Sequence, residues 1–133
     1  MFKCFIPQSW QYSNRNAVQG FLHPEGVYDD PKGGTLRTQL YHRLKYHFQF
    51  QNAYILFPIA HRAKYSINIF GQYTNKPIFY NISNLFLVKT IDTCFDHHGQ
   101  GKVEGIKNDD NQWNIQGHEK RILLTSCTYR VNS

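Results

Sequence analysis

The chain has 133 residues, 41% of them hydrophobic and 16% aromatic, which is enough for one domain with a packed core. Its net charge of +6 suits a nucleic-acid partner, although charge speaks to association and not to fold. No apolar run approaches the roughly 18 residues of a membrane span, and the start is too short and polar for a signal peptide. The three scattered cysteines indicate reduced thiols, so we expect a cytoplasmic protein without a membrane partner.

The first third of the chain predicts a lead-in, a strand and a helix. Residues 1–16 are polar and show no period, which indicates a poorly ordered lead-in. Residues 17–22 are apolar and are followed by turn residues, as at the end of a strand. Leu36, Leu40 and Leu44 recur every four residues, so they predict a helix over residues 36–46, with Thr35 as its N-cap.

The middle of the chain alternates apolar and polar residues, which is the period of a half-buried strand. Phe48 and Phe50 begin one such run, residues 48–51, and a second covers residues 65–69. Pro58 lies between them and cannot donate to a sheet ladder, so we expect a connection there. Helix, strand, loop and strand together predict a layered α/β unit.

Beyond residue 70 the pattern weakens. Residues 71–77 are a connector, and residues 78–87 indicate a short helix or an irregular packed segment. Residues 89–95 predict another short helix, residues 96–111 a loop whose glycines serve turns, and residues 122–124 a short strand.

Histidines and cysteines of the second half offer two further hypotheses. Cys94, His97, His98 and His118 are ligand types that zinc accepts, but the sequence has no Cys-x-x-Cys pair and Cys127 has no nearby partner of that kind. Polar loop histidines and buried structural thiols are therefore the favoured interpretation. The histidines could also form a His-Asn-His nuclease, in which an asparagine orients a histidine base and a metal is held by another histidine. Asn108 fits that spacing better than Asn114.

Phe57 lies beside Pro58 and is followed by the basic residues His61, Arg62 and Lys64. An aromatic ring at a strand junction among basic side chains could stack on an extruded base. Spacing alone favours ordinary core packing for this ring.

Two long runs resemble adenine-specific DNA methyltransferases, most closely the large type IIG restriction–modification and phage-exclusion kind. Residues 20–34 read Gly-Phe-Leu-His-Pro-Glu-Gly-Val-Tyr-Asp-Asp-Pro-Lys-Gly-Gly, and residues 36–52 read Leu-Arg-x-x-Leu-Tyr-x-Arg-Leu-x-Tyr-His-Phe-Gln-Phe-Gln-Asn. The resemblance extends over roughly residues 18 to 125.

The resemblance implies the rear half of a doubly wound sheet, with residues 17–22 as its fifth strand, residues 36–46 as the following helix, and the next two strands as an antiparallel closing hairpin. It also implies that Phe57 stacks on the flipped adenine, and that His61, Arg62 and Lys64 contact DNA. The resulting division is an unmatched lead-in (1–16), the methyltransferase-like part (17–72) and an irregular C-terminal extension (73–133).

The family's glycine-rich S-adenosylmethionine loop and its Asn-Pro-Pro-Tyr motif are absent from the sequence. We therefore expect no catalytic, cofactor-binding or metal-binding residue in this chain. The expected function is that of a methyltransferase fragment, truncated or split, that binds DNA, is inactive alone and works with a separate front-half chain. The alternatives are the small His-Asn-His nuclease and a non-catalytic interaction domain.

Overall fold

The computed structural model describes residues 2–14, 16–29, 33–103 and 105–126. In chain order the elements are α1 (Phe2–Tyr12), β1 (Gln19–Pro24), α2 (Gly26–Asp29), α3 (Gly34–Arg43), β2 (Leu44–Gln51), β3 (Lys64–Phe70), β4 (Ile78–Leu85), α4 (Lys89–Asp96), the 3-10 turn η1 (Glu119–Arg121) and β5 (Leu123–Ser126). The fold is therefore of the mixed α/β kind.

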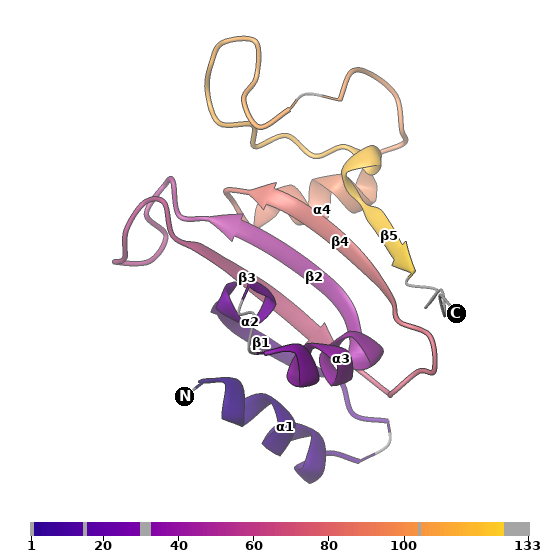
Figure 1. Cartoon of the computed structure of the whole chain (residues 1–133). Helices are drawn as coiled ribbons and strands as arrows, with labels where there is room; N and C mark the ends of the chain where they lie inside the picture. Colours follow the sequence, from indigo (N-terminus) through magenta and orange to yellow (C-terminus); the bar gives the residue numbers. More distant parts are fainter. Residues whose placement is uncertain (1, 15, 30–32, 104, 127–133) are drawn as a thin grey trace, which may run out of the picture.

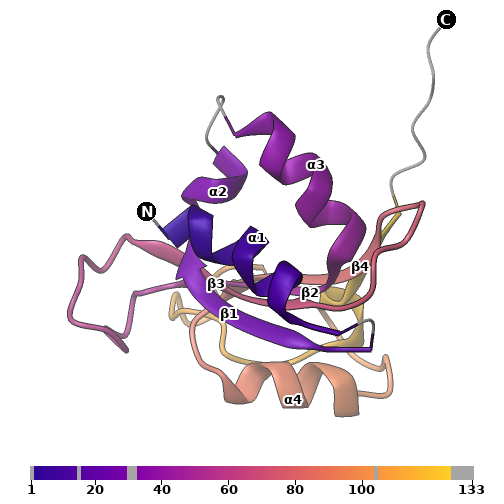
Figure 2. The same ribbon diagram turned by 90° about the horizontal axis from the view of Figure 1, so that it is seen from below.

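The five strands form one mixed sheet in the order β1-β3-β2-β4-β5 (Figure 1). Neighbours are antiparallel except β2 and β4, which are parallel. Helices α1, α2 and α3 lie on one face of the sheet and α4 lies on the other (Figure 2). The sheet continues across the boundary expected at residues 72 and 73, because β4 pairs with β2 and carries β5 beyond it.

Strand β3 lies between β1 and β2, and both of these are antiparallel to it. Strands β1 and β2 therefore run in the same direction, with α3 on the connection between them. The expected strand, helix and antiparallel hairpin are confirmed as elements. Because β4 is parallel to β2, the carboxyl ends of β1, β2 and β4 lie at the same edge, from which the β2–β3 loop projects (Figure 1).

The helix predicted over residues 36–46 ends earlier. Leu44 has an extended backbone (φ −66°, ψ 133°) and is the first residue of β2, where it pairs with Phe70. The strand preference of the aromatic sequence after Leu44 thus overrides the four-residue leucine spacing. The N-cap is Gly33 rather than Thr35, and it makes no side-chain capping bond.

Each face of the sheet has its own apolar core. On the α1–α3 face, the buried side chains are Ile6, Leu40, Leu44, Phe70 and Phe79. On the α4 face, they are Phe48, Phe50, Tyr65, Ile82, Leu85 and Cys94. Both faces are covered, as in other layered α/β domains.

Two further expectations from the sequence are wrong. The described part of the lead-in forms α1, whose Ile6 is 1% exposed and whose Trp10 packs edge-on against Phe70 with ring centroids 5.7 Å apart. Residues 78–85 form the strand β4 instead of a helix or an irregular segment. The helix expected at residues 89–95 is confirmed as α4, and the strand expected at residues 122–124 is confirmed as β5, one residue later.

Candidate functional site

The loop between β2 and β3 is organised by one buried asparagine. Asn52 is 0% exposed, and its side-chain amide nitrogen donates to the carbonyl oxygens of Phe57 (3.0 Å), Ile59 (3.0 Å) and Ala60 (3.4 Å). Its side-chain oxygen accepts from the backbone N–H of Phe57 at 3.2 Å, and its own backbone N–H donates to the carbonyl of Ala63 at 3.0 Å. One side chain therefore fixes the shape of residues 52–63.

The loop held by Asn52 presents a row of apolar side chains to solvent. The exposed fractions are 46% for Tyr54, 59% for Ile55, 43% for Leu56, 38% for Phe57 and 50% for Ile59. Ile55 has φ 50°, a left-handed conformation that is sterically costly for a β-branched residue. A loop that exposes apolar side chains and holds an unfavourable backbone angle has the character of a binding element.

Phe57 lies where the sequence places it, in the connection between β2 and β3. Its ring contacts Tyr65 edge-on, with centroids 5.1 Å apart, and Tyr65 in turn stacks on Phe50 at 5.4 Å. At 38% exposure, Phe57 is not a core residue, yet most of its side chain is covered by the protein. The ring is thus anchored on Tyr65 and remains partly open to a ligand.

The basic residues expected to contact DNA lie on the same segment. His61 and Arg62 are exposed in the loop, and Lys64 is exposed at the start of β3. The backbone N–H of Glu25 donates to the carbonyl of Lys64 at 3.4 Å, which joins the end of β1 to the end of the loop. Residues 52–63 contain no acidic residue, so the loop carries only positive charge.

Sequence reasoning missed a polar row that crosses the sheet on the α1–α3 face. The register places Asn68 of β3, His47 of β2 and Asn81 of β4 side by side. His47 Nδ1 lies 2.5 Å from Asn81 Oδ1, and His47 Nε2 lies 2.9 Å from Oε1 of Glu25. These contacts tie the end of β1 to β2 and β4.

The environment keeps Glu25 charged. Burial, the largest influence, acts to raise the pKa of Glu25, but hydrogen bonds from His47, Ser66 and Gln49 together hold the pKa below its usual value. Tyr28 of α2 covers the row: its ring packs edge-on against His47 at 4.7 Å, and its hydroxyl donates to Asn68. Burial also raises the pKa of Tyr28, so this hydroxyl stays a donor.

A cavity of about 250 Å³ adjoins this row, and Glu25, Tyr28, His47 and Asn81 are among the residues that line it. A carboxylate that holds a histidine ring is an arrangement able to store or pass a proton. The only sequence feature that pointed to this polar row was the alternation in β2 and β3, and its polar positions suggested a solvent-facing side of the sheet. Tyr28 of α2 instead covers His47 and Asn68.

The histidines of the second half come together only in part. The rings of His97 and His118 pack in a tilted arrangement, with centroids 4.1 Å apart. The expected orienting asparagines serve their own loops: Asn108 accepts from the backbone N–H groups of Asp110 and Gln112, both at 3.0 Å, and Asn114 donates to the carbonyl of Gly105 at 2.9 Å. The His-Asn-His alternative therefore gains no support from this geometry.

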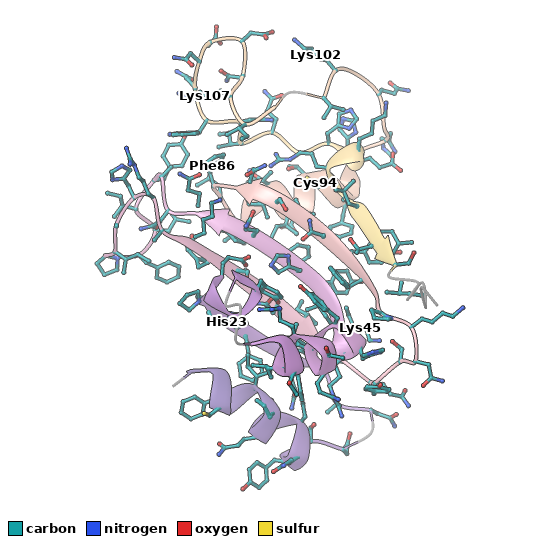
Figure 3. All side chains as sticks on the ribbon, viewed as in Figure 1. His23, Lys45, Phe86, Cys94, Lys102 and Lys107 are labelled. Atoms are coloured by element: carbon teal, nitrogen blue, oxygen red, sulfur yellow. The ribbon has the colours of Figure 1, made fainter. Side chains whose placement is uncertain are left out.

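The residues weighed as zinc ligands are distributed as follows. Cys94 is buried on α4 (Figure 3). His98 is exposed in the segment that follows α4. Cys127 lies outside the described residues. Within the described ranges, no group of three or more histidine, cysteine or acidic side chains is placed to hold a metal ion.

Comparison with models of known protein families finds no match, and neither does a search of curated proteins. In the part of the chain that the structure describes, every helix is too short or too polar to cross a membrane. The candidate site is therefore the β2–β3 loop, defined by residues 52–63 with Lys64, and its assignment depends on the chemistry of these residues.

Proposed function

We propose that this chain is the rear half of a DNA adenine methyltransferase-like α/β domain, and that its β2–β3 loop binds DNA. In this proposal Phe57 stacks on an adenine extruded from the duplex. The observation that carries it is the ring itself: anchored on Tyr65, 38% exposed, and held in a loop fixed by Asn52. An extruded base loses its stacking partners, and an aromatic face restores about 1–3 kcal/mol per base.

The position of the loop supports the proposal. Ligands of open α/β sheets bind outside the carboxyl ends of the parallel strands. The β2–β3 loop projects from the edge where β1, β2 and β4 end (Figure 1). Arg62 and Lys64 would contact phosphates beside the stacked base, which supplies salt-dependent affinity without base readout.

Under the same proposal, the isolated chain has no methyltransferase activity. S-adenosylmethionine would be bound by a separate front-half chain, because the glycine-rich loop and the Asn-Pro-Pro-Tyr motif are missing from this sequence. Calorimetric titration of the isolated protein with S-adenosylmethionine should give no binding heat. Micromolar affinity would contradict the assignment to a rear half.

The decisive experiment compares two duplexes in a fluorescence anisotropy titration, one fully paired and one with a single unpaired adenine. The wild-type protein should prefer the unpaired adenine, because less energy is needed to extrude it. Phe57→Ala should weaken binding to the duplex with the unpaired adenine by about 5- to 150-fold in Kd, the loss expected for one stacking contact of 1–3 kcal/mol. The preference for that duplex should disappear. The matched control is Phe5→Ala, which removes a ring that is 59% exposed on α1.

Stability measurements on the same variant separate a binding ring from a core ring. Full burial of a phenylalanine side chain is worth about 1.5–3 kcal/mol, so a ring with 38% exposure should lose only about 1–2 kcal/mol on truncation. Phe50→Ala, at a site with 1% exposure, should cost about 3–5 kcal/mol. Equal losses for the two variants, or equal binding by Phe57→Ala and wild type, would end the base-stacking assignment.

A non-catalytic interaction domain is the second candidate. It is favoured by Ile55, Leu56 and Ile59, which are exposed beside Phe57 but are not stacking residues. If neither duplex binds at low salt, this loop is better explained as an apolar contact for another protein.

A further inference from the structure

Arg43 is held between two aromatic rings at the opposite end of β2 from the β2–β3 loop. Its guanidinium carbon lies 4.9 Å from the ring centre of Trp10 on α1 and 5.7 Å from that of Tyr73 after β3. Contact with two aromatic rings restricts the orientation of the guanidinium.

The donors around this arginine lack acceptors. Within the described residues, the Arg43 guanidinium makes no ion pair, and its Nε is buried without a hydrogen-bond partner. The indole Nε1 of Trp10 is also buried without a partner. Two buried unpaired N–H groups are costly, since an unsatisfied donor loses its hydration without compensation.

Both side chains line a pocket of about 320 Å³ between α1 and the end of β3, and they also line a larger cavity beside α3. The other residues that line the first pocket are Ser13, Asn14, Ala17, Gln19, Gly71, Gln72 and Tyr73, and none of them is acidic. The pocket therefore combines the charge of Arg43 with room for a small molecule.

We propose that this pocket binds the oxyanion group, a phosphate or carboxylate, of a small molecule. The terminal N–H groups of Arg43 would donate to two oxygens of such a group, and Trp10, whose ring contacts the guanidinium, would sense the occupied pocket. The site is separate from the β2–β3 loop, so it stands whether or not that loop binds DNA.

The test observes the indole N–H signals in proton–nitrogen NMR spectra during a titration with inorganic phosphate, at constant ionic strength set with chloride. The chain has two tryptophans, and Trp113→Phe assigns their two signals. The Trp10 signal should move and saturate, whereas the Trp113 signal should stay. Arg43→Gln should weaken the response at least about tenfold, the loss expected for a charge-assisted hydrogen bond.

Lys107→Gln is the matched control, because Lys107 lies 4.8 Å from the ring centre of Trp113 and so repeats the cation–ring contact elsewhere (Figure 3). It should leave the Trp10 response unchanged. If Arg43→Gln does not fold, Arg43→Lys keeps the charge but loses the planar fork, and should still weaken binding severalfold.

Parallel titrations with acetate and with a short DNA duplex identify the source of the oxyanion. A saturable Trp10 shift with phosphate or acetate, absent with DNA, supports the small-molecule site. A shift with DNA alone would overturn that assignment in favour of a backbone phosphate. No saturable shift with any of them, or a shift of wild-type affinity in both Arg43 variants, would overturn the site altogether.

Discussion

Replacing Asn52 by alanine should loosen the β2–β3 loop far more than its size suggests. The amide nitrogen of Asn52 has two hydrogens for three carbonyl oxygens at 3.0, 3.0 and 3.4 Å, and its oxygen accepts one further bond at 3.2 Å. Three effective hydrogen bonds at about 0.5–1.5 kcal/mol each give roughly 2–4 kcal/mol. Water can reach some of the released carbonyl groups, so we expect Asn52→Ala to lower the free energy of unfolding by about 2–3 kcal/mol.

Two assays show where this free energy is lost. Urea unfolding measures the global loss, whereas trypsin cleavage after Arg62, which is exposed in the loop, measures opening of the loop. A loss of 2–3 kcal/mol confined to the loop should speed cleavage at this position by about 30- to 150-fold. Mass spectrometry of the fragments distinguishes this cleavage from cleavage elsewhere.

Asn75→Ala is the control, because Asn75 is an exposed asparagine in another connection of the sheet. It should change neither the unfolding free energy nor the cleavage rate at the loop. The reasoning fails if Asn52→Ala unfolds at the same urea concentration as the wild type and is cleaved at the same rate.

Two further changes test the interior. The pKa of Glu25 is lowered in the folded state, so its charge stabilises the fold above the unfolded pKa of about 4.3, and this contribution is lost as the pH falls through the folded pKa. Glu25→Gln should therefore be less stable than wild type in urea unfolding at pH 7, and the difference in unfolding free energy should be smaller near pH 3. An equal difference at the two pH values would show that the charge on Glu25 does not stabilise the fold. Gly117→Ala should cost about 1–3 kcal/mol in thermal unfolding, because its Cβ would lie 2.3 Å from Thr93 Oγ1, whereas Gly105→Ala meets nothing within 4 Å and should be nearly neutral.

The alternating strands could be predicted because each has one face on an apolar core. Phe48 and Phe50 project toward α4, and their polar neighbours project to the other side. The β4 strand could not be predicted this way, because Phe79 packs on one face while Ile82 and Leu85 pack on the other. A register shift against β2 and the left-handed Asn84 (φ 58°) replace the two-residue period by a three-residue one, which imitates a helix.

The position of Phe57 followed from its neighbours in sequence, since a proline-containing connection between two strands is a local feature. The polar row did not, because Glu25, His47 and Asn81 belong to separate segments that meet only through the strand order. Asn52 shows the same limit: nothing in the sequence near it indicates that its amide holds three carbonyls of the following loop.

The left-handed backbone of Ile55 places stability and binding in competition at one position. Glycine adopts this angle without the roughly 1–2 kcal/mol that it costs a residue with a Cβ. A selection for heat resistance alone would therefore tend to replace Ile55 and, with it, the most exposed apolar side chain of the loop. A selection that keeps the ligand of the loop would retain isoleucine, so the outcome at this single residue would reveal whether the apolar surface is used.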